Sequence, residues 1–451
     1  MKQTKKIRVM LAGIFLLQIG LLSGCSSHEV KIYDGEDAVF ASLHSSSLEK
    51  EKLEEGYRAY AEIVLNEAVQ LISEKENCEA EEAEKKLFRE QYTIYTAFSP
   101  EIYQSLKDAC HEYEDEKLSC GCAVTDLKGN LLAVYSAGEG EDADYNYATA
   151  KTPPYSSFKP LSVYAPAIEN GIASWSKMYE DSPIKQIEDS EGKMCDWPAN
   201  ATNTYTYEGV SVCTAIQKSL NTVAVKCLQE YGVDHSMQYL EKNFGISLDA
   251  ERSRAGLLGE EEIIGNIALG YLDDGVSPVD MAGYYQAFAN GGTYLKPKTI
   301  VKICKESGEV VFEQENQGRR VMNVETAFVM NKLLQGVVSQ DGTGRNARCE
   351  EVPVGGKTGT GDYGNWFVGF TPQYSCAVWH GTEIPENHAP EIFAKAVSLF
   401  EHDSSLDFPQ CGTVRTAAYC LESGGLITGG CKKVGTGYYT SMDNPLRCNM
   451  H

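Results

Sequence analysis

The stretch VGGKTGTGDYGNWFVGF, residues 354–370, decides the fold class. It predicts two short strands, 355–360 and 366–370, which are rich in β-forming residues and separated by turn residues. A third strand of the same kind is expected at 375–379. Residues from about 147 to 300 have the pattern of helices joined by loops. A helical block followed by an antiparallel sheet predicts an α+β domain, in which a helical subdomain packs against the sheet.

Further elements are expected before this block. Hydrophobic residues recur at spacings of three and four between Ser47 and Lys75, which predicts a helix, and residues 79–88 form a second, strongly charged one. A short strand is expected at 92–95, and Ser99 is expected to cap a following helix. Residues 121–135 have the pattern of a β-hairpin.

Three short motifs follow one another along the chain. They are an S-x-x-K at Ser156–Lys159, an S-x-N at Ser219–Asn221 and a K-T-G at Lys357–Gly359. The S-x-N and the K-T-G each occur once, whereas S-x-x-K occurs five times, also starting at Ser47, Ser174, Ser182 and Ser190. In this order, the three motifs are the sequence marks of penicillin-recognising serine enzymes.

The surroundings of Ser156 distinguish it from the other four candidates. Two prolines at 153–154 break the preceding segment, and an apolar run follows at 158–168, so the serine is expected on the first turn of a buried helix. On a helix, residues i and i+3 share a face, which would place Lys159 beside the Ser156 hydroxyl. A serine hydroxyl is a poor nucleophile until a base takes its proton.

A lysine can act as that base only if its pKa is lowered. Burial and a second cation nearby both have this effect, and Lys357 is the expected cation. We therefore predict Ser156 as the nucleophile and Lys159 as its general base. Ser219 is predicted to relay a proton between Lys159 and the leaving amine, and Asn221 to hydrogen-bond the peptide of the substrate.

The K-T-G strand is expected to bind the substrate. Lys357-Thr358-Gly359-Thr360 would form an edge strand along which a peptide aligns, and Gly359 would leave room for close approach of another backbone. The hydroxyls of Thr358 and Thr360, together with Lys357, would bind a terminal carboxylate. Backbone N–H groups of Ser156 and Thr360 would form the oxyanion hole. Taken singly, each motif also has a structural explanation as a helix cap or an exposed strand, but the ordered set favours function.

The N-terminus has the pattern of an export signal. Basic residues at positions 2–8 precede an apolar stretch, Val9–Leu22, that is shorter than a bilayer span. It ends in Leu22-Ser23-Gly24-Cys25, which resembles a bacterial lipoprotein signal with Cys25 as the lipid attachment site. We therefore expect a lipid-anchored protein on the outer face of the cytoplasmic membrane; an ordinary signal peptide is the alternative. The expected domains are 1–25 (signal), 26–91 (linker and helical pedestal) and 92–451 (catalytic).

Charge and motif searches exclude several classes of protein. The net charge of −24 in 451 residues, with no basic stripe, argues against nucleic-acid binding. Gly356-Lys357-Thr358 ends like a phosphate-binding loop, but the first glycine of that motif would fall at Glu351. The eight histidines include no H-E-x-x-H pair. We expect no cofactor and assign no metal ligand to the active site.

Cysteines crowd the end of the chain. Fifteen are present, so 15 − 1 = 14 remain if Cys25 is lipidated. Cys411, Cys420, Cys431 and Cys448 fall in the last part of the sequence, and His451 ends it. An exported context allows disulfides, and Cys420–Cys431 is the preferred pair; a Cys/His zinc site is the alternative.

The residues around the motifs resemble the transpeptidase domain of class A penicillin-binding proteins. This resemblance extends from about Tyr92 to the end, and its segments are Tyr155–Pro160, Ser219–Thr222, Ala268–Gly270, Gly275–Ala282, Phe288–Gly292, Lys357–Thr360 and Trp366–Pro372. It implies a β-lactamase-like fold and a D,D-transpeptidase that cross-links peptidoglycan stem peptides through a Ser156 acyl-enzyme and binds β-lactams. Tyr155 stands where Gly is commoner in the family.

Class A members also carry a glycosyltransferase domain, which the residues before Tyr92 do not resemble. We therefore expect a separate glycan polymerase as a partner. Two other activities stay open: a D,D-carboxypeptidase or β-lactamase, in which water attacks the acyl-enzyme, and a non-catalytic β-lactam sensor or scaffold.

Overall fold

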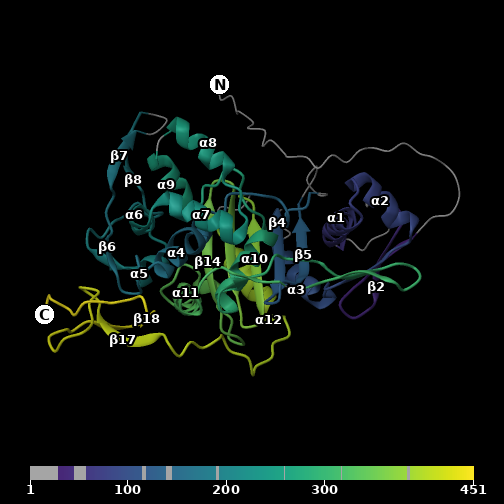
Figure 1. Cartoon of the computed structure of the whole chain (residues 1–451). Helices are drawn as coiled ribbons and strands as arrows, with labels where there is room; N and C mark the ends of the chain where they lie inside the picture. The colour runs from purple at the N-terminus through teal and green to yellow at the C-terminus, as the bar shows by residue number, and fades with distance from the viewer. Residues whose placement is uncertain are drawn as a thin grey trace.

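A central antiparallel sheet organises the molecule (Figure 1). The computed structural model describes residues 29–44, 57–113, 118–138, 145–188, 192–258, 260–315, 317–382 and 386–451. The sheet has the order β14-β15-β16-β4-β5. Its strands are β14 (Gly355–Gly361), β15 (Gly364–Phe370), β16 (Tyr374–His380), β4 (Cys120–Asp126) and β5 (Leu131–Ala137). The three predicted C-terminal strands and the predicted hairpin are therefore confirmed, and β14 lies at the edge.

Helices cover both faces of this sheet. Alternate residues of a strand point to opposite faces, and Phe370 and Phe367 of β15 illustrate this. The Phe370 ring packs against Phe288 of α10 (Pro278–Ala289), with ring centroids 6.3 Å apart. The Phe367 ring packs against Phe393 of α12 (Ala389–Ser398), at 4.8 Å. Helix α11 (Val324–Val337) packs against β14 and α10, and α3 (Pro100–His111) packs against α12.

A helical subdomain lies beside the β14 edge (Figure 1). Its helices are α4 (Ala165–Glu169), α5 (Val212–Lys218), α6 (Asn221–Tyr231), α7 (Val233–Phe244), α8 (Asp249–Leu258) and α9 (Glu260–Leu269). Two small two-stranded sheets interrupt them, β6 (Met178–Glu180) with β9 (Gly209–Ser211) and β7 (Lys185–Glu188) with β8 (Met194–Trp197). Helices packed against an antiparallel sheet confirm the predicted α+β class, with a helical subdomain beside the sheet.

A second five-stranded sheet corrects the expectation for the N-terminal region. Its order is β12-β11-β3-β1-β2. The strands are β1 (Val30–Tyr33), β2 (Val39–Leu43), β3 (Thr93–Thr96), β11 (Ile300–Cys304) and β12 (Val310–Glu313). The linker expected in the first part of residues 26–91 is wrong where the structure describes it, because strands of four or five residues have too little periodicity to recognise. Strand β1 also joins the sheet through the distant β3. The sheet also pairs strands from both sides of the boundary expected at 91/92.

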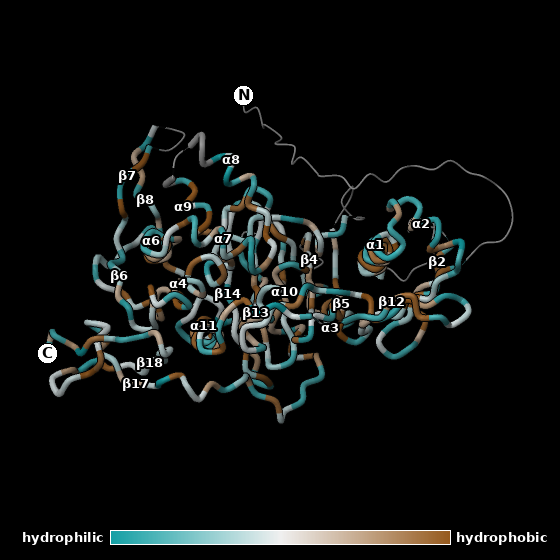
Figure 2. The backbone as a smooth tube through the Cα atoms, in the orientation of Figure 1, coloured by the Kyte–Doolittle hydropathy of each residue, from teal (hydrophilic) through white to brown (hydrophobic). Residues whose placement is uncertain are grey.

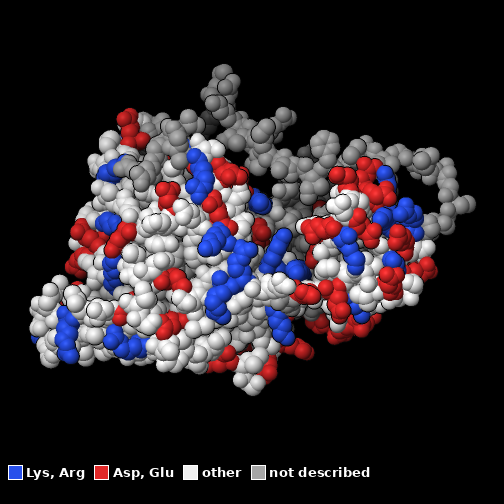
Figure 3. Space-filling view, viewed as in Figure 1, with Lys and Arg blue, Asp and Glu red and all other residues white. Residues whose placement is uncertain are grey.

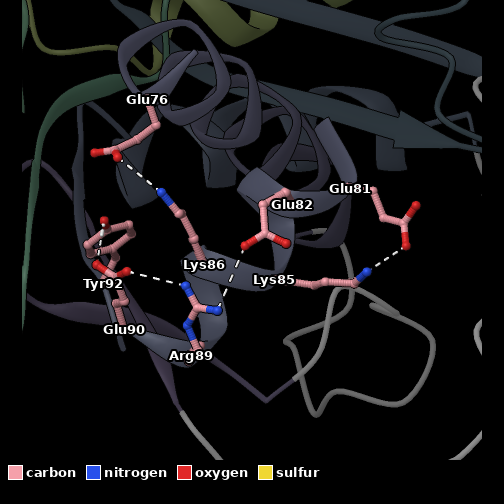
Figure 4. A network of polar contacts seen from close by, with 8 residues as sticks. All are labelled: Glu76, Glu81, Glu82, Lys85, Lys86, Arg89, Glu90 and Tyr92. Carbon is pink, nitrogen blue, oxygen red and sulfur yellow. Dashed lines mark hydrogen bonds and ion pairs between the residues drawn. The ribbon is translucent and has the colours of Figure 1, made fainter. Parts of the chain in front are cut away.

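Helix α1 (Tyr57–Glu76) packs on this N-terminal sheet and α2 (Ala80–Arg89) packs against α1, and the two helices differ in polarity. Helix α1 buries an apolar stripe, whereas α2 is mainly hydrophilic (Figure 2). Ion pairs link α2 to α1 and to itself, including Lys86–Glu76 at 3.0 Å and Lys85–Glu81 at 2.6 Å (Figure 4). Acidic and basic side chains intermingle over this end of the molecule (Figure 3). Such exposed pairs contribute little stability individually.

The last residues form a separate small hairpin. Strands β17 (Arg415–Cys420) and β18 (Val434–Tyr439) pair antiparallel and lie away from the central sheet, next to the helical subdomain (Figure 1). Within the described ranges, no helix is both long and apolar enough to span a bilayer. Cys25 and the signal segment lie outside the described residues, so the lipid-anchor prediction stays a prediction.

Candidate active site

The candidate nucleophile lies on an irregular turn. Residues Tyr155–Phe158 form a 3₁₀ turn, and a π-helical turn follows at Pro160–Tyr164 before α4 begins. The helix predicted here is therefore not regular in its first turns. Ser156 is partly exposed, whereas Ser157 is buried. The turn thus presents only the first of its two serines to solvent.

Backbone strain accompanies this turn. Tyr155 has a φ of 49°, in the left-handed region that residues with a side chain seldom occupy. This conformation gives a physical reason why Gly is the commoner residue at the position. Three contacts stabilise it here. The Tyr155 N–H donates to the Gly270 carbonyl at 3.0 Å, the Tyr155 hydroxyl accepts from the Tyr363 N–H at 3.0 Å, and the ring packs edge-on against Tyr271.

Ser157 has a structural role in the same turn. Its hydroxyl donates to the Pro154 carbonyl at 2.5 Å, and its own carbonyl accepts a hydrogen bond from the Tyr285 hydroxyl. Both groups of Ser157 are therefore used to fix the turn. This leaves Ser156 as the serine available for chemistry.

The Lys159 side chain extends from the serine turn to the S-x-N motif. Its Nζ lies 2.9 Å from the Ser219 carbonyl oxygen, 2.5 Å from Asn221 Oδ1 and 3.5 Å from Ser219 Oγ. The side chain is 1% exposed. In the described part of the chain, Ser156 Oγ makes no hydrogen bond, so direct pairing of Ser156 with Lys159 stays a prediction. Catalytic hydrogen bonds are commonly long until substrate binds.

The S-x-N motif spans the junction of two helices. Ser219 ends α5 in the left-handed region, with a φ of 58°, and Asn221 is the first residue of α6. This sharp reversal turns both side chains toward Lys159. The Asn221 amide nitrogen donates to the Ala199 carbonyl at 2.6 Å, which orients its oxygen toward the lysine.

A buried carboxylate supports this junction. Asp181 is 1% exposed and accepts hydrogen bonds from Asn200 Nδ2 at 2.8 Å and Thr222 Oγ1 at 2.6 Å. Asn200 Oδ1 in turn accepts from the Asn221 N–H at 2.9 Å. Sequence reasoning missed Asp181 and Asn200, because no motif marks them.

Lys357 approaches the same serine from the sheet. Its Nζ donates to Ser219 Oγ at 2.8 Å and to the Thr358 carbonyl at 3.0 Å, and its side chain is fully buried. Ser219 Oγ therefore lies between two buried amines. The structure brings together Lys159, Ser219, Asn221 and Lys357, as the sequence predicted.

Both amines lose basicity in this environment. Burial, together with the nearby charge of Lys357, lowers the pKa of Lys159 well below its ordinary value. Burial lowers the pKa of Lys357 to about 7. Removing an ammonium from water disfavours its charged form, and a second cation adds to this effect. Lys159 is thus suited to accept a proton at neutral pH.

Two glycines of β14 allow the sheet edge to meet the serine turn. A Cβ on Gly359 would lie 2.5 Å from the Pro154 carbonyl oxygen, and one on Gly361 would lie 2.2 Å from the ring of Tyr155. Gly359 therefore allows a close backbone approach by the serine turn, and close approach by a substrate peptide stays a prediction. This contact places Ser156 beside the K-T-G strand.

The two threonines of the strand have different partners. Thr358 Oγ1 lies 2.9 Å from Thr343 Oγ1 and 3.4 Å from Lys357 Nζ. Thr360 Oγ1 accepts a hydrogen bond from Asn387 Nδ2 at 3.1 Å. The same amide nitrogen also lies 3.1 Å from the Gly359 carbonyl. A hydroxyl that accepts a hydrogen bond from an amide can still donate its own hydrogen to an anion. Thr360 needs this free hydrogen if it is to bind the carboxylate of a substrate, as predicted.

The site therefore contains the groups that acyl transfer by a serine requires. It has a partly exposed serine, a buried lysine of lowered basicity, a hydroxyl shared by two amines and an edge strand for an extended substrate. No hydrogen bond identifies the oxyanion donors among the described residues, so the N–H groups of Ser156 and Thr360 stay a prediction. Asn387 and Thr343 were not predicted, because they lie far from the motifs in sequence.

Comparison with protein families gives one match over the catalytic region. A model described as "Penicillin binding protein transpeptidase domain" matches residues 121–397. This range contains all three motifs and all five strands of the central sheet except the first residue of β4.

Curated relatives are similar over part of their length. Penicillin-binding protein 1A of Clostridium botulinum (strain Hall) is 39% identical over 246 residues, covering 53% of this chain and 28% of that protein. Penicillin-binding protein 1F of Bacillus subtilis (strain 168) is 29% identical over 433 residues, covering 87% of this chain and 56% of that protein. The chain thus spans less than two thirds of either relative.

Solved structures share the fold. The D,D-transpeptidase domain of a peptidoglycan glycosyltransferase from Eggerthella lenta matches with a TM-score of 0.62 at 19% identity, covering 83% of this chain and 98% of that one. Penicillin-binding protein A of M. tuberculosis, as an imipenem acyl-enzyme complex, matches with a TM-score of 0.64 at 17% identity, covering 83% and 99%.

Proposed function

Because this chain belongs to the penicillin binding protein transpeptidase domain family, we propose that it is a serine D-Ala-D-Ala transpeptidase that cross-links peptidoglycan stem peptides. One observation carries the proposal: Ser219 Oγ lies between Lys159 and Lys357, and Gly359 packs against the turn that presents Ser156. This arrangement joins a nucleophile, a base and a proton relay.

The first half of the reaction forms the acyl-enzyme. Neutral Lys159 takes the proton of Ser156 as its Oγ attacks the carbonyl carbon of the penultimate D-Ala. The tetrahedral intermediate collapses with cleavage of the C–N bond. Ser219 passes a proton to the departing D-Ala amine and recovers one from Lys159, so no charge accumulates on the relay.

The second half reverses these steps with a different amine. An amino group of a neighbouring stem peptide attacks the ester carbonyl, gives up its proton through Ser219 and Lys159, and releases Ser156. The C-terminal carboxylate of the donor peptide would be bound by Lys357, Thr358 and Thr360 during acylation, because charge-assisted hydrogen bonds are the stronger kind. Binding of β-lactams follows the same course, with the ring amide as the attacked bond.

The alternatives differ only in what attacks the ester. In a D,D-carboxypeptidase or a β-lactamase, water replaces the amine, while the residues for acylation remain the same. A non-catalytic β-lactam sensor would acylate and then not turn over. The buried pair of lysines supports an enzyme over a scaffold, because burying two amines is costly without a function.

The location and partner belong to the same proposal. We propose that Cys25 carries a lipid that anchors the protein on the outer face of the cytoplasmic membrane. Two acyl chains give a stable membrane hold that one does not. Replacing Cys25 with Ala should leave the precursor unprocessed, whereas normal processing and retention would contradict the anchor. Glycan strands would come from a separate polymerase, so the purified 451-residue chain should polymerise no lipid-linked precursor.

A paired assay tests the enzymatic core of the proposal. The protein is incubated with a stem pentapeptide donor and a labelled D-amino acid acceptor, and products are separated by mass. Transpeptidation predicts that acceptor-containing peptide exceeds the hydrolysed tetrapeptide. Hydrolysed product alone would favour the carboxypeptidase, and persistent acylation by fluorescent penicillin without either product would favour the sensor.

A further inference from the structure

The C-terminal tail, residues 411–451, lies beyond the family match at 121–397 and has little core of its own. Its β17–β18 hairpin is two-stranded, and an isolated hairpin of this size is marginally stable in water. Several of its apolar side chains are exposed, namely Leu421, Ile427, Val434, Met442, Leu446 and Met450. Small folded units of this kind usually require a cross-link or a metal.

Three potential metal ligands meet inside this tail. Cys420 Sγ, Cys448 Sγ and a ring nitrogen of His451 all lie within 4.8 Å of one another, and both cysteines are buried. Cys431 lies beside these three ligands, because its thiol hydrogen-bonds that of Cys448. Cys431 Sγ is also oriented by Thr428, whose N–H and hydroxyl lie 3.4 and 3.6 Å from it.

Backbone pairing brings these distant residues together. Leu426 bridges to Tyr419 on one side and to Arg447 on the other, so three segments of the tail run side by side. The Cys448 N–H donates to the Leu426 carbonyl at 2.8 Å. The Thr428 hydroxyl donates to the His451 carbonyl at 3.1 Å, which fixes the last residue next to Cys431. The ligands are therefore positioned by main-chain contacts.

We propose that the tail is a structural zinc site with Cys420, Cys431, Cys448 and His451 as its four ligands. Three thiolates and one imidazole are a common tetrahedral set for structural Zn²⁺, and the soft sulfur ligands disfavour Mg²⁺ and Ca²⁺. Binding replaces the thiol protons, so up to three protons are released to solvent and no electrons are transferred.

Glu422 gives independent support for the histidine. Its carboxylate lies 2.6 Å from His451 Nε2, and its other oxygen lies 3.2 Å from Lys433 Nζ. A metal-bound histidine commonly donates its second ring N–H to a carboxylate, which fixes the tautomer. With Nε2 on Glu422, Nδ1 is the nitrogen available to the ion.

A disulfide accounts for these positions less completely. One disulfide would use two of the three clustered thiols and would leave the third thiol and the histidine without a role. Cys420 and Cys431, the pair that the sequence favoured, are not joined by a disulfide in the structure. A four-ligand site uses every member of the cluster.

Ser176 is one of the residues that connect the tail to the catalytic domain. Ser176 Oγ donates to the Gly424 carbonyl at 2.6 Å and accepts from the Tyr439 hydroxyl at 2.9 Å. The neighbouring carbonyls of Trp175 and Lys177 accept from Cys213 N–H and Val212 N–H, in the first turn of α5. Helix α5 ends at Ser219, so the zinc-bound tail supports the helix that carries the proton relay.

Metal analysis of the full chain tests the proposal. The protein is purified without chelators and titrated with Zn²⁺, and Co²⁺ serves as a spectroscopic probe. We expect about one Zn²⁺ per chain and a Co²⁺ spectrum with thiolate charge-transfer bands and intense tetrahedral d–d bands. A chain that binds neither ion would overturn the site. Peptide mapping that finds Cys420 bonded to Cys431 or Cys448 in the native protein would overturn it equally.

Matched variants locate the ligands. Cys448→Ser should lower zinc content at least tenfold, whereas Cys411→Ser should retain it, because the Cys411 thiol lies against the Thr413 hydroxyl and is not part of the cluster. If Cys448→Ser fails to fold, His451→Gln at the chain end should still fold and release zinc to a chelator faster. Chelation should lower the Tm of the wild type and leave that of Cys448→Ser unchanged. Equal zinc content in all variants would contradict the assignment.

Discussion

Lys159 and Lys357 converge on one hydroxyl, that of Ser219, with Nζ–Oγ distances of 3.5 and 2.8 Å. One lysine comes from the serine turn and the other from the edge strand of the sheet. Both are buried, and burial lowers the pKa of each. The two amines can therefore divide their roles, with Lys159 as the proton acceptor and Lys357 as the cation that binds a carboxylate.

The serine turn predicts a single site of acylation. Mass spectrometry of the β-lactam-treated protein should show one adduct, on Ser156, and Ser156→Ala should abolish it. Ser157→Ala should keep the adduct, because the Ser157 hydroxyl is used by the Pro154 carbonyl. Loss of that hydrogen bond should lower the free energy of unfolding by about 1 kcal/mol. An adduct that maps to Ser157, or one that survives Ser156→Ala, would show that the nucleophile is misassigned.

Removing the base should slow acylation without preventing it. Lys159→Ala is expected to reduce the second-order rate constant for penicillin labelling roughly 10²–10⁴-fold, the usual contribution of a general base. Lys218→Ala is the matched control, since Lys218 adjoins Ser219 in sequence but donates to the Asp341 carbonyl at the surface. The measurement is the second-order rate constant for labelling by a fluorescent penicillin, determined for both variants. Equal rates in the two variants would exclude Lys159 as the base.

Much of this site could be predicted from the sequence, because its motifs are short and local. The S-x-x-K, S-x-N and K-T-G place Lys159, Ser219 and Lys357 in order, and the structure brings them together. The predictions that failed concern strands and contacts that depend on segments far apart in the sequence. Strand β1 pairs with the neighbouring β2 but joins the sheet through the distant β3, and Asn387 reaches Thr360 only after the sheet has folded.

The buried lysines predict a bell-shaped pH profile for acylation by a penicillin. On the acid side the rate falls as Lys159 gains a proton, because a protonated amine is no base. On the alkaline side it falls above about pH 7, where Lys357 loses the charge that binds the carboxylate. The measurement is the labelling rate from about pH 5 to about pH 10.

A substitution and a modified ligand check the alkaline side of that profile. Lys357→Arg keeps a cation throughout this range, so the alkaline fall should disappear. A β-lactam methyl ester has no carboxylate, so its slower reaction with the wild type should also lack the fall. If the ester shows the same alkaline fall as the free acid, Lys357 does not act through the carboxylate.

The contact between β14 and the serine turn gives the last prediction. In Gly359→Ala, the new Cβ would lie 2.5 Å from the Pro154 carbonyl oxygen and 3.2 Å from the Ser157 nitrogen. It would also lie 3.1 Å from Trp366 Cβ. The atom that it would meet most closely belongs to the backbone of the serine turn, so the turn must shift. Overpacking of this kind commonly costs roughly 1–3 kcal/mol of unfolding free energy.

Acylation should suffer more than stability in this variant, because a shift of about 1 Å in a nucleophile can cost on the order of 10²-fold in rate. Gly412→Ala is the control, since no atom lies within 4 Å of a Cβ built there. Thermal unfolding and penicillin labelling are measured on both variants. If Gly359→Ala acylates at the wild-type rate, the sheet edge does not position Ser156, and the glycine serves only the fit of β14 in the fold.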